Sequence, residues 1–386
     1  MQEALHLGPV EWGWVTGVFT LAYAIFEIPS GALGDRIGPR RVLTRIVLWW
    51  SAFTSLTGMV TGYYPLLATR FLFGAGEAGA FPNASIAVAR WFPVPERGRA
   101  IGIWLMASQV GGAIAPLLVV PIQIRYGWRA SFYVFGVLGV GWSAIWYWWF
   151  RDSPAEKAGV SEAELEETRH VPAKAHHALP WNTVVRSGNF WATMSVAFCY
   201  VYTYNFFQSW FHTYLVKAHG YSENDLLLSS LPFLVGACGN CTGGLASSAL
   251  VKRVGLKRGR CSIGVGSLAI AAVCTAGASF TDHRMGVLIL LSLVYGAICF
   301  QQPTMFAVCL DIGGEYAGAT TGAMNTAAQI GSFVSSLAFG YLVKVYGNYN
   351  APLIPMAAIL LTGAWLWLKV DPSQALIPRA RAAAAI

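Results

Sequence analysis

Apolar runs of about 20 residues recur along nearly the whole chain, and an α-helix needs a run of this length to cross a bilayer. An outer-membrane β-barrel would instead show short segments that alternate between apolar and polar residues. Only 11% of the residues are charged, whereas a soluble domain averages about 25%. The pattern therefore predicts an all-α membrane protein with about eleven transmembrane helices. These helices are expected at 12–33, 42–63, 66–90, 99–121, 130–150, 190–216, 227–250, 261–280, 285–308, 317–343 and 351–370.

A polar stretch at 151–189 separates two sets of apolar runs. Ser161 and Glu164 have the spacing of a capping box, so a short surface helix is expected after Ser161. The stretch also contains His170, His176 and His177. They lack cysteine partners and a regular ligand spacing, which favours a solvated linker over a metal site. The predicted domains are an N-terminal bundle at 1–150, a cytoplasmic linker at 151–189, a C-terminal bundle at 190–372 and a cytoplasmic tail at 373–386.

Lysine and arginine gather in some of the loops between these runs and avoid others. GDRIGPRR, RWFPVPERGR and KRVGLKRGR are basic, whereas TGYYP, SFTDHR and YGNYN are poor in positive charge. Basic loops face the cytoplasm, so the C-terminus is expected inside and the N-terminus outside a cell (inner) membrane. This placement explains the net charge of +8 without nucleic acid as a partner.

Two parts of the chain match each other in the same order. ERGRAIGIWLMASQVGG, from Glu96, matches EYAGATTGAMNTAAQIGS, from Glu315, and GALGDRIGPRR, from Gly31, matches GLASSALVKRVGLKRGR, from Gly244. The pairs that share one constant offset are Gly102 with Gly322, Gln109 with Gln329 and Gly111 with Gly331. An internal duplication of this kind predicts two six-helix-type bundles related by pseudo-two-fold symmetry, the architecture of parallel-repeat transporters.

Several ordered motifs resemble those of the major facilitator superfamily. GALGDRIGPRR resembles the signature loop between its second and third helices. The segments that resemble its anion:cation symporter branch are FEIPSGALGDRIGPRRVL, RFLFGAGEAGAFPN, WFPVPERGRAIG, GWRASF, SWFHTYL and GAMNTAAQIG. That branch carries sugar acids and other organic anions with protons or sodium. The resemblance runs from the second through the twelfth helix of the family, so the first helix is expected to be missing.

The resemblance implies a secondary active transporter that imports an organic anion by proton symport with alternating access. The expected substrate is a sugar acid, such as an aldonate, aldarate or hexuronate. The expected partners are this anion, the coupling proton (or sodium) and the lipid bilayer, and the chain is expected to be a monomer without cofactor or metal. Two alternatives stay open, namely a transporter of aromatic or small carboxylic acids and a truncated product that does not transport. No H-E-x-x-H or G-x-S-x-G motif occurs, so an enzyme is not expected.

The stretch RFLFGAGEAG, residues 70–79, places two charges in an apolar run. Arg70 and Glu77 are seven residues apart, so on a helix they point almost the same way at a separation of about 10 Å. An arginine offers a planar fork to a carboxylate, and a glutamate in a low-dielectric environment resists ionisation and can carry a proton. We therefore expect Arg70 to bind the anion and Glu77 to couple the proton, roles that the resemblance also implies. The alternative is a buried salt bridge that ties helices together.

Five further residues are candidates for binding the substrate or the proton, namely Tyr23, Glu27, Gln109, Tyr204 and Asn325. Tyr23 is expected near the depth of Glu77, where its hydroxyl can meet the substrate. Glu27 is a second carboxylate in an apolar run, and it can be a proton site, a gate or part of a packing salt bridge. Gln109 and Asn325 carry amides suited to substrate hydroxyls or to neighbouring helices. Tyr204 can line the cavity or simply pack among aromatic residues.

The signature loop also carries candidate gating residues. They are Asp35, Arg36, Arg40 and Arg41, together with Arg97 and Arg99 of another basic loop. Asp35 is expected to accept hydrogen bonds from Arg97 or Arg99 and to face a helix N-terminus, which would latch the cytoplasmic side.

The second copy of the loop departs from the family pattern. Ser248 and Ala249 stand where the family often has Asp-Arg. The gate of the second bundle is therefore expected to depend on Lys252 and Arg253 or to be weaker.

Overall fold

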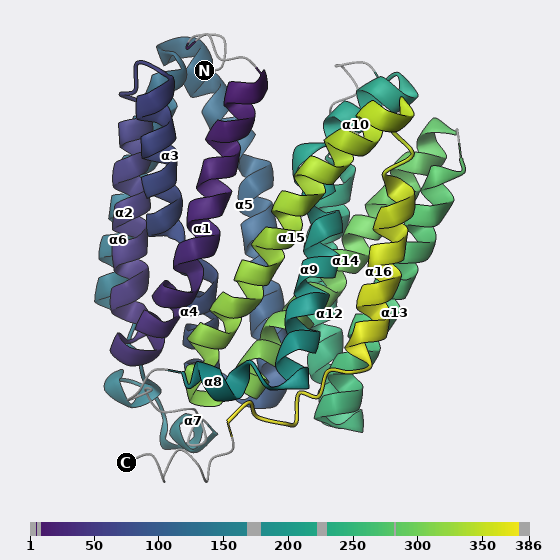
Figure 1. The fold of residues 1–386 in the computed structure, drawn as a ribbon. Helices are drawn as coiled ribbons and strands as arrows, with labels where there is room; N and C mark the ends of the chain where they lie inside the picture. The colour runs from purple at the N-terminus through teal and green to yellow at the C-terminus, as the bar shows by residue number, and fades with distance from the viewer. Residues whose placement is uncertain (1–4, 6–8, 168–178, 222–229, 282, 378–386) are drawn as a thin grey trace. The chain divides into compact units, whose positions relative to one another are not determined.

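In the computed structural model, residues 5, 9–167, 179–221, 230–281 and 283–377 are described. Over these residues the backbone forms helices and turns without strands (Figure 1). The helices are α1 (Pro9–Ile37), α2 (Pro39–Thr57), α3 (Tyr63–Glu77), α4 (Ala80–Trp91), α5 (Arg97–Tyr126), α6 (Trp128–Trp149), α7 (Glu162–Glu167), α8 (Trp181–Val184), α9 (Gly188–Ser209), α10 (Phe211–His219), α12 (Leu231–Val254), α13 (Leu256–Ser279), α14 (Arg284–Gly313), α15 (Ala317–Tyr346) and α16 (Leu353–Trp367). The linker histidines His170, His176 and His177 lie outside the described residues.

Each predicted transmembrane segment contains a helix, but two of the segments are broken. The third, 66–90, divides into α3 and α4 because Gly79 adopts a left-handed conformation with a φ of 88°. The sixth, 190–216, divides into α9 and α10 at Trp210, whose φ of −121° and ψ of −18° are not helical. The prediction of one continuous helix was wrong at both places.

Among the described residues, five helical stretches are by themselves long and apolar enough to cross a membrane. They are Gly17–Ile37, Trp128–Trp149, Leu231–Val254, Leu256–Ser279 and Arg284–Tyr346. The last of them contains both α14 and α15. These stretches support the membrane class, and the total of about eleven crossings stays a prediction.

The capping box predicted in the linker is confirmed. The Ser161 N–H donates to Glu164 Oε2 at 2.9 Å, and the Glu164 N–H donates to Ser161 Oγ at 3.3 Å. The hydrogen bond from the Ser161 backbone, followed by that from its hydroxyl, holds the pKa of the Glu164 carboxyl below its usual value. The short helix α7 starts directly after this pair.

Contacts divide the chain into two compact units. Unit 1 consists of Met1–Pro93, Ile114–Leu179 and Gly313–Thr326, and unit 2 consists of Val94–Ala113, Pro180–Ile312 and Ala327–Ile386. The start of α5 therefore belongs to unit 2 and its end to unit 1, whereas the start of α15 belongs to unit 1 and the rest of α15 to unit 2. The predicted bundles at 1–150 and 190–372 follow chain order and stay a prediction.

Unit 1 is built around α2, which packs beside α6 and α3 (Figure 1). One side of α2 buries Val42, Ile46 and Val47, at the i, i+4 and i+5 spacing of a helix face. Gly136 lets α6 approach closely, since a Cβ at this position would lie 2.9 Å from the Ser51 carbonyl oxygen of α2. Small residues at such contacts are how membrane helices pack tightly.

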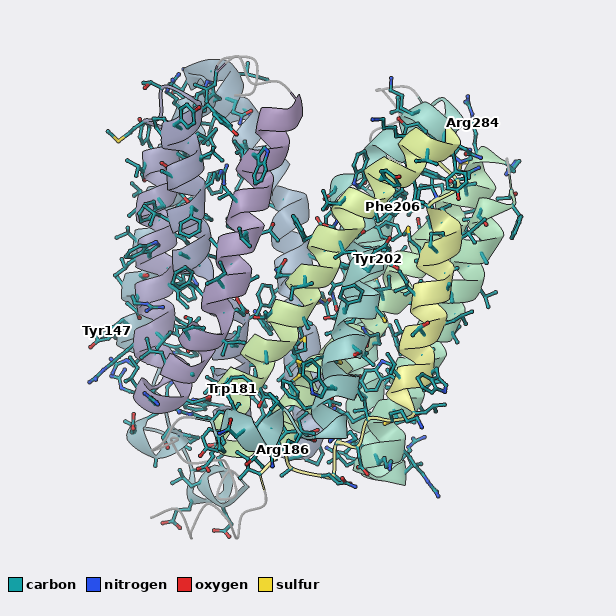
Figure 2. All side chains as sticks on the ribbon, in the orientation of Figure 1. Tyr147, Trp181, Arg186, Tyr202, Phe206 and Arg284 are labelled. Carbon is teal, nitrogen blue, oxygen red and sulfur yellow. The ribbon has the colours of Figure 1, made fainter. Side chains whose placement is uncertain are left out.

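Unit 2 packs α16 against α9 and α13. Trp367 of α16 is fully buried, and Gly264 of α13 leaves the space that its indole ring fills. On α9, Phe206 lies edge-on to Phe211 at 6.0 Å and to Tyr214 at 5.6 Å between ring centroids (Figure 2). These aromatic contacts fix α9 and α10 on either side of the break at Trp210.

The internal repeat has a counterpart in each unit. In unit 1, the backbone of Gly31 in α1 lies directly against Gly318 at the start of α15. In unit 2, the backbone of Gly244 in α12 lies directly against Gly98 at the start of α5. Gly31 and Gly244 begin the two loop segments that match in the sequence, so the matched positions make matching helix contacts.

Candidate functional site

The last turns of α3 carry both predicted charges of the membrane segment. Arg70 is half-buried, and its guanidinium carbon lies 5.8 Å from the centroid of the Phe73 ring. Among the described residues, the side chains of Arg70 and Glu77 form no hydrogen bond and no ion pair within 4.0 Å, and they act on each other only through longer-range electrostatics. The alternative of a buried salt bridge between them is therefore not formed, and both groups are available to a ligand or a proton.

Glu27 of α1 meets the break between α3 and α4. Its side chain is fully buried; Oε2 accepts from the Gly79 N–H at 2.9 Å, and Oε1 accepts from Asn325 Nδ2 at 2.7 Å. Glu27 thus holds the backbone two residues beyond Glu77 and ties it to the start of α15. No cation pairs with Glu27 within the part of the chain that the structure describes, so the packing salt bridge considered for it is not formed.

Tyr23 lies one turn before Glu27 on α1, within electrostatic range of both Glu27 and Glu77. Its side chain is 4% exposed, and its buried hydroxyl has no hydrogen-bond partner among the described residues. Gly74 lets α3 pack closely against α1, because a Cβ at this position would lie 2.4 Å from the Phe19 carbonyl oxygen of α1. A buried hydroxyl without a partner costs free energy, which makes Tyr23 a ready hydrogen-bonding group for a ligand.

Asn325 lies in the part of α15 that belongs to unit 1. Its amide reaches Glu27, and the neighbouring Thr326 hydroxyl donates to the Ala24 carbonyl of α1 at 3.1 Å. Of the two roles considered for this amide, the contact to a neighbouring helix is present. Substrate binding by Asn325 stays a prediction.

A second polar cluster lies wholly within unit 2. Gln109 of α5 donates from Nε2 to the Tyr295 hydroxyl of α14 at 3.1 Å, and Gln208 of α9 does the same at 3.2 Å. The ring of Tyr204 stacks on that of Tyr295 with centroids 5.3 Å apart. The sequence analysis identified Gln109 and Tyr204 but missed Tyr295 and Gln208. The sequence signal for Tyr295 and Gln208 was a polar side chain inside a predicted transmembrane segment, 285–308 and 190–216 respectively.

Asp35 ends α1 with a buried carboxylate. Oδ1 accepts from the Gly318 N–H at 2.8 Å and Oδ2 from the Ala319 N–H at 2.9 Å, at the N-terminus of α15. The expected position at a helix N-terminus is confirmed. Backbone N–H groups donate to both carboxylate oxygens, and donation from Arg97 or Arg99, which belong to unit 2, stays a prediction.

The arginines of the signature loop differ in their surroundings. Arg40 donates from Nε to the Tyr147 carbonyl at 2.8 Å, and its guanidinium carbon lies 4.2 Å from the centroid of the Tyr147 ring. The Arg40 N–H donates to Asp152 Oδ1 at 2.9 Å, which fastens the loop to the end of α6. Arg36 and Arg41 are exposed, as the positive-inside rule expects.

Unit 2 holds a buried ion triad that the sequence analysis missed. Asp311 of α14 pairs with Arg97 at 3.3 Å and with Arg260 of α13 at 3.3 Å, and all three side chains are at most 5% exposed. Arg260 also donates to Ser247 Oγ at 2.8 Å. In the sequence Arg260 belongs to a basic loop, so nothing there distinguishes it from an exposed arginine.

The remaining gating candidates of unit 2 gather around Glu96. Arg99 Nη2 lies 3.7 Å and Lys252 Nζ 3.2 Å from the Glu96 carboxylate. The Arg99 N–H donates to Ser248 Oγ at 2.9 Å. Ser248 therefore meets the start of α5 as Asp35 meets the start of α15, with a neutral hydroxyl in place of a carboxylate. Arg253 is exposed.

The described residues include no group of three or more histidine, cysteine, aspartate or glutamate side chains that could hold a metal ion. Unit 1 does contain Arg70 and Glu77 on one predicted membrane helix, α3, without an ion pair between their side chains. This combination can bind an acid group and exchange protons.

The family model for the Major Facilitator Superfamily matches residues 1–336. Among curated proteins, the probable sulfoacetate transporter SauU of Cupriavidus necator is 35% identical over 378 residues, covering 96% of this chain and 87% of that protein. The D-galactonate transporter of Escherichia coli O6:H1 is 29% identical, covering 94% of this chain and 87% of that protein. The hexuronate transporter of Bacillus subtilis is 26% identical, with coverages of 92% and 84%.

A solved structure has the same fold. The human organic anion transporter MFSD10 (TETRAN) aligns with a TM-score of 0.73 over 92% of this chain and 83% of that one. The two sequences are 14% identical, so this likeness concerns the fold alone.

Proposed function

This chain belongs to the Major Facilitator Superfamily, and on that premise we propose that it imports a small organic anion together with protons. Proteins of this family are membrane transporters rather than enzymes. The similar proteins are named as transporters of sulfoacetate, galactonate and hexuronate, which are all organic acids. We take a sugar acid as the substrate class.

One observation carries the proposal, namely that Arg70 and Glu77 occupy one helix and neither pairs with another described residue. Charged side chains inside a membrane are costly and mark substrate or ion paths. Arg70 can hold a carboxylate through two parallel hydrogen bonds, and the Tyr23 hydroxyl can add a third contact. Glu77 is assigned the coupling proton because carboxyl groups inside membrane segments serve as proton relays.

Further residues support this assignment with smaller roles. Glu27 is a second candidate proton carrier, since its charged form depends on N–H donors from Gly79 and Asn325. Gln109, Tyr204 and the amide of Asn325 are assigned to the polar groups of the substrate.

Transport is expected to proceed by alternating access in the cell (inner) membrane, with a cytoplasmic C-terminus and a monomeric chain. The gating residues are Asp35, Arg36, Arg40, Arg41, Arg97 and Arg99. Asp35 contributes by holding the N-terminus of α15, and breaking these two backbone hydrogen bonds would free that helix to move.

Replacement of Glu77 by glutamine tests the proposed coupling. The amide keeps the shape of the side chain but cannot carry a proton, so proton-driven accumulation should vanish while exchange of internal for external substrate continues. Both activities are measured in proteoliposomes with labelled D-galactonate, with and without an inward proton gradient. Glu162→Gln is the matched control, because Glu162 is an exposed glutamate of the linker helix α7, outside the proposed substrate path. Intact accumulation in Glu77→Gln would refute the assignment.

A second substrate class follows from the similarity to the probable sulfoacetate transporter. Sulfoacetate has two acid groups and no hydroxyl. Uptake of sulfoacetate in the same assay, without uptake of sugar acids, would favour this class and leave the role of Arg70 unchanged.

A further inference from the structure

Tyr295 is the centre of the polar cluster in unit 2. Its side chain is fully buried in α14, yet its hydroxyl accepts hydrogen bonds from Gln109 and Gln208, which belong to two other helices. Its ring also stacks on that of Tyr204. Three helices therefore meet at one uncharged oxygen atom.

The position of this hydroxyl is fixed by packing. The Tyr295 ring contacts Phe207 at 4.9 Å and Phe233 at 5.2 Å between centroids, in addition to stacking on Tyr204. Gly236 of α12 leaves the space for the ring, since a Cβ there would lie 2.5 Å from it. A side chain held on this many sides keeps one rotamer, so its hydroxyl is preorganised.

The two glutamines each use their Nε2 on Tyr295, and this leaves their Oε1 atoms as acceptors. In the described part of the chain, no group donates to Gln109 Oε1 or Gln208 Oε1. Gln208 is exposed, and Gln109 is half-buried, so a ligand can reach them. Amide oxygens accept from hydroxyl groups, whereas carboxylates and sulfonates have no hydrogen to give.

We infer that Tyr295 and Gln208 are specificity-determining residues that select a hydroxylated acid, with Tyr295 orienting the two glutamine amides toward substrate hydroxyls. This rests on the proposed function, the import of an organic acid. A site that offers unpaired acceptors favours a polyhydroxylated acid such as D-galactonate over sulfoacetate, which carries no hydroxyl. The cluster therefore decides between the two substrate classes that the relatives' names suggest.

Tyr295→Phe tests this inference, because it removes the hydroxyl and keeps the stacked ring. Uptake kinetics of D-galactonate and sulfoacetate are measured in proteoliposomes for the full chain. The unaltered protein should prefer D-galactonate, and Tyr295→Phe should raise the KM for D-galactonate by roughly tenfold without changing sulfoacetate transport. Gln208→Met, which keeps the length of the side chain, should act in the same direction. Tyr202→Phe is the control, since Tyr202 is a buried tyrosine of the same helix as Tyr204, outside the cluster.

Each other outcome overturns the inference in a distinct way. An unchanged KM for D-galactonate in Tyr295→Phe and Gln208→Met would show that the hydroxyl is not used. An equal loss of both substrates would show a structural role only. A preference of the unaltered protein for sulfoacetate would reverse the inferred class and leave anion transport standing, whereas uptake of neither acid would count against the proposed function itself.

Discussion

Arg70 is half-buried in a membrane helix and has no carboxylate partner among the described residues. Its guanidinium is always charged, so an anionic ligand is the natural partner for it. Tyr23 and Glu77 present a hydroxyl and a carboxyl to the same region of unit 1. The residue-level account is thus an anion-binding group next to a proton-carrying group.

Arg70→Lys should separate charge from shape. Lysine keeps the positive charge but loses the planar fork, so the KM for the transported acid should rise by roughly tenfold, which corresponds to about 1.4 kcal/mol. Arg70→Gln should abolish uptake because it also removes the charge. Initial uptake rates over a range of substrate concentrations give both results, with Arg186→Lys as the control at an exposed arginine without a proposed role. An unaltered KM in Arg70→Lys would mean that the arginine does not hold the acid group.

The break between α3 and α4 is the element that connects the end of α3 to Glu27 of α1. Gly79, two residues after Glu77, turns the chain with a positive φ, and its N–H donates to Glu27. A change at Glu77 can therefore reach Glu27 through two peptide units and one hydrogen bond, and α15 through the further hydrogen bond from Asn325.

Gly79→Ala should weaken this junction. Its Cβ would be strained at a φ of 88° and would collide with the Ser30 side chain, which together should cost about 1–3 kcal/mol of folding free energy. Thermal unfolding of the purified protein in detergent measures the loss. Gly141→Ala in α6 is the control, because nothing lies within 4 Å of a Cβ there. Equal stability of the two variants would contradict the account of the break.

The helical segments and the signature loop were predictable from sequence because long apolar runs and glycine-rich basic loops are local signals. The shared face of Arg70 and Glu77 followed from their spacing alone. The break at Gly79 was not predictable, since a glycine in an apolar run is compatible with an unbroken helix. Neither was the contact of Glu27 with Asn325, which joins residues far apart in the chain and depends on tertiary packing.

On the scale of the whole molecule, each unit contains the first turns of one helix from the other half of the sequence. Equivalent contacts hold these first turns in the two units. Unit 1 holds the start of α15 with the Asp35 carboxylate, and unit 2 holds the start of α5 with the Ser248 hydroxyl. Unit 2 adds the buried triad of Arg97, Arg260 and Asp311. The two repeats thus form the same kind of contact between helices, but a carboxylate makes it in unit 1 and a hydroxyl makes it in unit 2.

Asp311→Asn should destabilise the protein strongly. It removes the negative charge that Arg97 and Arg260 share, and breaking a buried ion pair costs about 3–5 kcal/mol. Lys252→Ala removes an exposed pair with Glu96 and should cost less than about 1 kcal/mol. Thermal unfolding of both variants in detergent provides the comparison. Similar losses in the two variants would contradict the structural importance of the triad.

The central claim is that one chain moves an organic acid and protons together through Arg70 and Glu77. The most direct test is the external pH of weakly buffered proteoliposomes when D-galactonate is added without a pre-formed gradient. The account predicts alkalinisation that accompanies substrate uptake, that disappears in Glu77→Gln and that a protonophore collapses. Uptake of D-galactonate without any movement of protons would contradict it.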